Sequence, residues 1–207
     1  MSLYPIFLKL EGRRVLIVGG GAVAEQKIEA VLRSATDVTI IAHTVSERIR
    51  SWVEQGRVKH VASEYSAGMA QGYFLVIACT TSEDVNRAVY EEATSYGALV
   101  NAVDDPDHCS FYAPAVVSRG DFQIAISTGG HSPALAQQVR QELEKKYGPE
   151  YGPWTTWLGR ARALLRQTLP PGEGRRQMLH LLAVARPEKF SHTENSKGGQ
   201  YGPTQEG

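Results

Sequence analysis

Cysteine is scarce in this chain, and long apolar runs are missing. Only Cys79 and Cys109 occur among 207 residues. A secreted scaffold held by disulfides carries more cysteines, so we interpret these two as free thiols in a reducing cytoplasm. No apolar run approaches the roughly 18 residues that cross a membrane. The N-terminal stretch MSLYPIFLKLEG also lacks the basic and then apolar regions of a signal peptide. We therefore expect a cytoplasmic protein with no membrane partner.

An excess of either charge is missing as well. The 22 basic and 22 acidic side chains give a formal net charge of zero. Proteins that bind phosphate backbones normally carry a basic excess, so nucleic acid is not expected as the main partner. With 42% apolar residues, the 207-residue chain has the composition of a globular protein. Its length suffices for one domain plus an appendage, or for two small domains.

Strand and helix patterns alternate over the first hundred residues. The strand-like runs are 14–18, 37–42, 57–62, 73–79 and 97–103. Helical periodicity follows the first, second and fourth of these runs, and Ser82 is the expected N-cap of the last helix. Such alternation predicts an α/β fold in which helices cover a mostly parallel sheet.

The pattern changes after Pro114. The stretch AVVSRGDFQIAIS (115–127) predicts two strands joined by a turn at 119–121. Two strands are too few for a stable sheet, so we expect a homodimer in which a second copy covers the exposed strand edges. A helix should follow, with Ser132 as its N-cap and Pro133 in its first turn. Its apolar stripe is expected to hold Leu135, Val139 and Leu143.

The C-terminal part contains two further helical patterns. The stretch YGPEYGP (147–153) is expected to be a linker. Helices are predicted over about 154–169 and 175–185. The tail from Ser191 is polar and rich in glycine, and we expect it to be disordered.

A glycine fingerprint follows the first predicted strand. The stretch VLIVGGGAVAEQK contains G-x-G-x-x-A as Gly19, Gly21 and Ala24. The first glycine permits a tight turn, the second lets the backbone approach a pyrophosphate, and the small third residue lets the helix pack on the sheet. The alternative is a glycine turn that binds nothing. Because the motif lies between a clear strand and a clear helix, we favour a dinucleotide site, with phosphates at the helix N-terminus.

The acid that usually ends the second strand of such a site is missing. NAD-binding units commonly use that acid to hold the ribose hydroxyls, whereas this strand ends in Ala42, His43 and Thr44. Thr44 can hydrogen-bond a ribose. No arginine adjoins the strand end to bind the additional phosphate of NADP, although Arg48 is near in sequence. We favour NAD over NADP.

The fifth predicted strand leads into the acidic stretch VNAVDDPDHCSF. It places Asn101 and then Asp104 at the carboxyl edge of the sheet, which the glycine loop shares, so Asp104 is expected near a bound nicotinamide. The alternative, a solvated polar turn, is about equally favoured for Asp104 from the pattern alone. A metal site at His108 and Cys109 is not expected, because adjacent residues of an extended chain point to opposite sides and no zinc-ligand spacing is near.

Three motifs together resemble one known family. The stretches YPIFLKLEGRRVLIVGGGAVAEQK, VNAVDDPDHCSFYAPAVV and IAISTGGHSPALAQQVRQELE occur here in this order. They resemble precorrin-2 dehydrogenase, the NAD-dependent enzyme of sirohaem synthesis, and some members also act as sirohydrochlorin ferrochelatase. The resemblance runs from Tyr4 to about Tyr147. It implies an NAD-binding Rossmann-like domain (1–113), a dimerisation and substrate segment (114–148) and a helical C-terminal domain (149–190), before the tail at 191–207.

The resemblance also implies a set of site residues. The expected cofactor-binding residues are Gly19, Gly20, Gly21, Ala22, Val23, His43, Thr44 and Thr80. Asp104 matches the family's catalytic aspartate. The expected substrate-binding residues are Asn101, Ser127, Thr128, Gly129, Gly130, His131 and Ser132. Residues 127–132 offer hydroxyl groups, backbone amides and a helix N-terminus to a carboxylate-rich tetrapyrrole. The alternative is that they form a simple strand-to-helix turn. Arg119 is a further candidate donor.

These residues suit an oxidation of precorrin-2 to sirohydrochlorin. That reaction removes a hydride, which NAD accepts, and a proton. An aspartate is ionised at neutral pH, so Asp104 can take the proton as a general base. Ferrochelatase activity is left open. Two alternatives are an NAD-sensing regulatory module and a chelatase without dehydrogenase activity, but the sensor would give no role to the stretches NAVDDP and STGGHSP.

Overall fold

The computed structural model describes residues 3–184, and these form two compact units that divide between Ala113 and Pro114. The first unit contains one sheet of five strands. The strands are β1 (Arg14–Val18), β2 (Asp37–Ile41), β3 (Lys59–Val61), β4 (Leu75–Ala78) and β5 (Leu99–Ala102). All neighbouring strands are parallel, and their order is β3-β2-β1-β4-β5. The predicted parallel α/β fold is confirmed.

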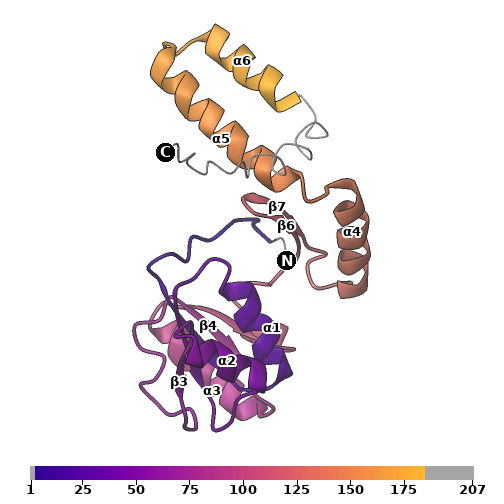
Figure 1. Ribbon diagram of the computed structural model, residues 1–207. Helices are drawn as coiled ribbons and strands as arrows, with labels where there is room; N and C mark the ends of the chain where they lie inside the picture. The colour runs from indigo at the N-terminus through magenta and orange to yellow at the C-terminus, as the bar shows by residue number, and fades with distance from the viewer. Residues whose placement is uncertain (1–2, 185–207) are drawn as a thin grey trace, which may run out of the picture. The chain divides into compact units, whose positions relative to one another are not determined.

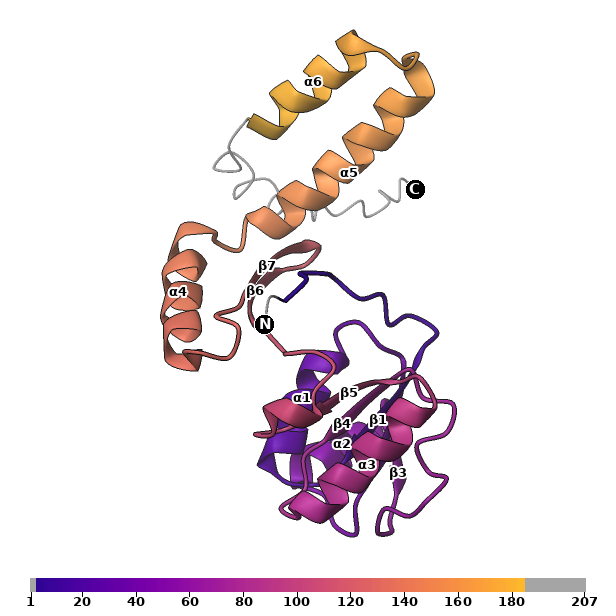
Figure 2. The same ribbon diagram turned by 180° about the vertical axis from the view of Figure 1, so that it is seen from behind.

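Helices cover both faces of this sheet. Helices α1 (Ala22–Val31) and α2 (Glu47–Glu54) lie on one face, and α3 (Glu83–Ser95) lies on the other (Figures 1 and 2). Because side chains alternate along a strand, Val15 and Ile17 of β1 pack toward α1 and α2, whereas Leu16 and Val18 pack toward α3. Burial on both faces explains why β1 is a continuous apolar run.

The strand order places a topological switch at β1. The chain moves from β1 to β2 on one side and returns to β4 on the other side. Connections therefore diverge at the carboxyl ends of β1 and β4, where α/β sheets commonly bind ligands. The glycine loop follows β1 at this point.

The second unit is a hairpin followed by helices. Strands β6 (Ala115–Arg119) and β7 (Phe122–Ile126) pair antiparallel, as predicted. They are followed by α4 (Pro133–Lys146), α5 (Tyr151–Thr168) and α6 (Glu173–Val184). The predicted cap of α4 is confirmed, because Ser132 Oγ accepts a hydrogen bond from the Leu135 amide at 3.2 Å. The homodimer through this hairpin and the separation of 114–148 from 149–190 stay predictions.

One prediction for this unit was wrong in detail. The expected linker at 147–153 is helical in its second half, because α5 begins at Tyr151. Gly152 and Pro153 fit there since the first amides of a helix need no intrahelical acceptor. On the apolar stripe expected for α4, Leu135 is 50% exposed, whereas the neighbouring Ala136 is buried. The expected disordered tail from Ser191 lies outside the described residues.

Candidate functional site

Three loops meet at the carboxyl edge of the parallel sheet. The Gly19 amide donates to the carbonyl of Ile41 at the end of β2 (2.9 Å), and the Ser46 amide donates to Gly20 O (3.1 Å). On the other side, a Cβ atom on Gly19 would lie 2.6 Å from the carbonyl oxygen of Cys79, which follows β4. The fold therefore brings together the predicted cofactor residues that follow β1, β2 and β4.

The three consecutive glycines of the loop differ in the space that a side chain would have. Gly19 has φ +120°, and both its conformation and its contact with Cys79 exclude a side chain. A Cβ on Gly20 would overlap Thr44 O. Gly21 has no atom within 4 Å of such a position. The first two glycines are thus required by the packing of the loops, whereas Gly21 borders open space that a ligand can enter.

The N-terminus of α1 is suited to an anion. Gly21 is its N-cap, and no side chain caps the first turn, so amides of that turn remain available for a phosphate. Ala22 and Val23 in this turn are exposed. The one acid of the turn, Glu25, already accepts hydrogen bonds from Ser46 Oγ (2.7 Å) and from Arg48 (3.4 Å).

Arg48 is held between α1 and α2. Its guanidinium pairs with Glu25 at 3.4 Å and with Glu29 at 3.0 Å. It also lies over the ring of Trp52, 5.2 Å from the centroid. These contacts tie Arg48 to the helix pair. At the end of β2 itself, the exposed His43 faces Glu64 at 3.3 Å.

Thr80 is fixed by an asparagine that the sequence analysis missed. The carboxamide oxygen of Asn86 accepts from the amide of Thr80 (3.1 Å) and from its hydroxyl (2.8 Å), and its nitrogen donates to Thr80 O (3.1 Å). Asn86 is buried in the first turns of α3. The sequence could have indicated this role, because Asn86 lies beside Val85 and Val89 on the buried face of the predicted helix. A buried polar side chain needs a hydrogen-bond partner.

Asp104 has an unusual backbone conformation. It follows β5 by two residues, and with φ +63° it is the only non-glycine residue between 3 and 184 with a positive φ. This left-handed region costs an ordinary residue roughly 1–2 kcal/mol, although aspartate tolerates it better than most. Its side chain is exposed, and no residue of the described chain hydrogen-bonds it. Such outliers cluster at functional sites, where surrounding structure maintains them.

The turn after Asp104 is stabilised from within. It contains the 3₁₀ turn η1 (Pro106–His108). Asn101, predicted to bind substrate, is buried, and its nitrogen donates to Phe111 O (3.0 Å) and to Cys109 Sγ (3.3 Å). The side chain thus ties the returning chain to β5. A role of Asn101 in substrate binding stays a prediction.

Metal ligands do not gather in the described part of the chain. Among residues 3–184 there is no group of three or more histidine, cysteine, aspartate or glutamate side chains that could hold an ion. Over the same residues, no helix is both long enough and apolar enough to span a bilayer.

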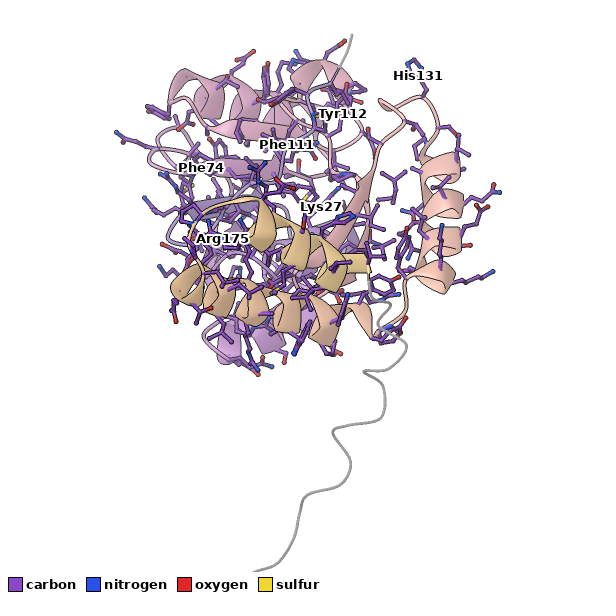
Figure 3. All side chains as sticks on the ribbon, turned by 90° about the horizontal axis from the view of Figure 1, so that it is seen from above. Lys27, Phe74, Phe111, Tyr112, His131 and Arg175 are labelled. Atoms are coloured by element: carbon purple, nitrogen blue, oxygen red, sulfur yellow. The ribbon has the colours of Figure 1, made fainter. Side chains whose placement is uncertain are left out.

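Both thiols are kept neutral by burial. Burial raises the pKa of the Cys79 thiol to about 12, and the ammonium group of Lys27, labelled in Figure 3, only partly opposes this rise. Burial also raises the pKa of Cys109, whose Sγ donates to the carbonyls of Ala102 and Asp105, both at 3.1 Å. We infer that neither thiol is a nucleophile.

This inference predicts slow alkylation of the native protein. Iodoacetamide at about pH 8 reacts with the thiolate, and a raised pKa leaves little thiolate at Cys79 and Cys109. Mass spectrometry should find both residues unmodified in the folded protein and modified after unfolding in guanidinium. Rapid labelling of either cysteine under native conditions would contradict the assignment.

The loop STGGHSP belongs to the second unit and is held by its own hydroxyl oxygens. Ser127 Oγ accepts from the amide of Gly129, Thr128 Oγ1 accepts from the amide of Ser132, both at 3.1 Å, and Ser132 caps α4. Gly129 and Gly130 both have positive φ. In each bond the oxygen accepts, so the hydroxyl hydrogens stay available to donate. His131, labelled in Figure 3, is exposed, and its Cδ2 atom lies 3.7 Å from the position of a Cβ atom built on Gly129.

Arg119, a further candidate donor to the substrate, has structural contacts within the second unit. Its guanidinium donates to the carbonyls of Tyr147 (3.1 Å) and Glu144 (3.4 Å) at the end of α4. A cation at this position satisfies helix carbonyls that lack an intrahelical partner. Arg119 thus joins the hairpin to α4.

Comparison with known proteins assigns the family. A family model described as "Putative NAD(P)-binding" matches residues 6–115, and one described as "Sirohaem biosynthesis protein central" matches residues 119–146. A solved structure titled "SirC, precorrin-2 dehydrogenase" superposes with a TM-score of 0.76 and 28% identity, covering 92% of this chain and 94% of that one. The chain belongs to the family described as "Putative NAD(P)-binding", whose model covers more than half of its residues. The predicted resemblance is confirmed.

Curated relatives in this family are longer proteins. The siroheme synthase of Photobacterium profundum is 38% identical over 177 residues, which cover 86% of this chain and 38% of that protein. The siroheme synthase of Neisseria meningitidis serogroup C is 37% identical over 177 residues, again 86% of this chain and 37% of the relative. The chain thus spans less than half the length of these synthases.

Proposed function

We propose that this protein oxidises precorrin-2 to sirohydrochlorin with NAD as the hydride acceptor. The observation that carries the proposal is one sheet edge that holds both an open glycine-rich helix N-terminus and, two residues beyond β5, an aspartate with a left-handed backbone. The similarity to a structure titled precorrin-2 dehydrogenase supports the same reaction.

In this mechanism the chain's own residues bind the cofactor and move one proton. The amides of Ala22 and Val23 would bind the pyrophosphate, and Gly21 leaves room for it. Thr44 and Thr80 lie on the flanking loops and would orient the nucleotide. Bound NAD supplies a nicotinamide ring that accepts the hydride. Asp104 would take the proton that leaves the macrocycle, since its carboxylate is exposed and has no competing hydrogen bond within the described residues.

The electrostatics of the β2 edge favour NAD over NADP. An additional phosphate needs a free arginine or lysine, but Arg48 is paired with Glu25 and Glu29. The carboxylate of Glu64 lies 3.3 Å from His43 at the end of β2. This negative charge would repel the additional phosphate of NADP. We therefore expect a higher kcat/KM with NAD than with NADP.

The test is an anaerobic assay of the purified protein with precorrin-2 and either NAD or NADP. We expect equimolar formation of NADH and sirohydrochlorin, followed by absorbance at the NADH band and in the visible bands of the macrocycle. Folded protein that binds NAD but forms no NADH would favour the NAD-sensing module. Metal insertion into sirohydrochlorin without oxidation of precorrin-2 would favour a chelatase alone.

The substrate loop and the oligomeric state belong to the same proposal. The hydroxyl groups of Ser127, Thr128 and Ser132 would donate to substrate carboxylates, and His131 would add a donor. A homodimer would extend the sheet of β6 and β7, which has two strands in the described chain. Light scattering at micromolar concentration should give the mass of a dimer. The mass of a monomer would contradict the proposed homodimer.

A further inference from the structure

A histidine and an aspartate form a close pair in the turn that follows Asp104. Asp105 Oδ2 lies 2.6 Å from His108 Nδ1. The His108 amide donates to Asp105 O at 3.2 Å, and the edge of the pair packs on α3, where the Tyr90 ring lies 4.9 Å from the imidazole in a T-shaped arrangement. The imidazole is therefore held in one orientation by contacts from two elements.

The pair has the geometry of a proton relay. An ionised carboxylate can only accept, so His108 Nδ1 carries the hydrogen of this bond and Nε2 of the neutral ring presents a lone pair. No described residue occupies Nε2. When the ring takes a second proton, the Asp105 carboxylate stabilises the imidazolium, as the aspartate of a catalytic triad does.

Both side chains are partly open to solvent. The His108 side chain is 28% exposed and that of Asp105 is 36% exposed. The neighbouring Cys109 thiol does not compete for the proton, because burial keeps it neutral and its one S–H hydrogen is directed to the carbonyl oxygens of Ala102 and Asp105. The pair thus lies between the fixed turn and water. Asp105 follows Asp104 directly in the sequence, and His108 lies four residues beyond Asp104.

We propose that His108 is a proton-transfer residue of the oxidation and that Asp105 is its positioning residue. This inference rests on the proposed function. A bound macrocycle would cover the exposed Asp104 and separate its carboxylic acid from water. His108 provides the next acceptor, on the same turn and still partly exposed.

The proposed oxidation removes one hydride and one proton from precorrin-2. One C–H bond of precorrin-2 breaks, and its hydrogen leaves with two electrons as a hydride to oxidised NAD, which is reduced to NADH. A second bond to hydrogen in the macrocycle then breaks: its hydrogen leaves as a proton and forms an O–H bond on Asp104, and its electron pair stays on the macrocycle and completes the new double bond. The O–H bond on Asp104 then breaks, an N–H bond forms at His108 Nε2, and the imidazolium releases the proton to water.

The experiment compares His108→Ala with the wild-type protein in the anaerobic oxidation assay. We expect turnover to fall at least about tenfold, with NAD affinity unchanged, because one proton-transfer step is slowed. Added imidazole should restore part of the rate in the alanine variant, since it can enter the vacated space and accept the proton. A purely structural loss would not respond to imidazole.

Further variants separate the roles. His108→Gln keeps a polar side chain of similar size without a basic nitrogen, so it should fold as the wild type and lose rate as the alanine variant does. Asp105→Asn should slow turnover by a smaller factor. His180→Ala, on the exposed surface of α6, is the matched control and should turn over normally.

Two results would overturn the proposal: wild-type turnover in both His108 variants, or a loss of rate that imidazole does not restore. Failure of the proposed function is distinct, since in that case the wild-type protein itself would form no NADH from precorrin-2.

Discussion

The Asp104→Asn variant is expected to form NADH from precorrin-2 about 10²–10⁴-fold more slowly than the wild-type protein, the range that a positioned general base contributes. The amide has the shape of the carboxylate but cannot accept the proton. Asparagine, like aspartate, tolerates a left-handed backbone, so the turn at φ +63° should persist. Turnover at saturating NAD and the melting temperature measure the two effects separately.

Two further variants control this experiment. Asp104→Gly removes the carboxylate and adopts the positive φ without strain, so it should lose the rate and keep the fold. Asp107→Asn changes an exposed aspartate of the same turn and should behave as the wild type. If Asp104→Asn retains near wild-type turnover, Asp104 is not the base.

The second large effect is expected at the glycine loop. In Gly20→Ala, the new methyl group would overlap Thr44 O and lie 2.9 Å from the Ala42 Cβ atom. Both neighbours are part of the strand end and its loop, so they cannot move without backbone shifts. Overpacking of this kind costs roughly 1–3 kcal/mol or more of unfolding free energy. Thermal unfolding should show a clear drop in melting temperature.

Gly21→Ala, in the same loop, is the matched control for Gly20→Ala, because it tests cofactor binding without the steric overlap. Gly21 has φ −87°, which alanine adopts readily, and no atom lies within 4 Å of the added Cβ. Stability should therefore change by less than about 0.5 kcal/mol. If the pyrophosphate approaches this backbone, the methyl group should weaken NAD binding about 10- to 100-fold, the equivalent of a 1–3 kcal/mol steric cost. Unchanged affinity in a calorimetric titration would place the cofactor elsewhere.

The regular elements of this chain were largely predictable from local pattern. Continuous apolar runs marked β1 and β4, and serine caps marked the starts of α3 and α4. The start of α5 was not predicted, because Gly152 and Pro153 are also typical of linkers. The exposure of Leu135 could not be predicted, because helical periodicity defines an apolar stripe of a helix but does not specify which residues of the stripe other elements cover.

The sequence by itself determined the α/β class, the glycine fingerprint and the family, because strand and helix periods and motif spacing are local properties of the chain. Only the tertiary structure decided that Asn101 holds a turn, that Asn86 holds Thr80, that Arg48 is paired between two helices, and that Asp105 holds His108. Those contacts depend on where packing directs each side chain. Spacing along the sequence does not specify that direction. Asn101 and Asp104 therefore looked equivalent in the sequence, but the side chain of Asn101 holds a turn whereas that of Asp104 is exposed.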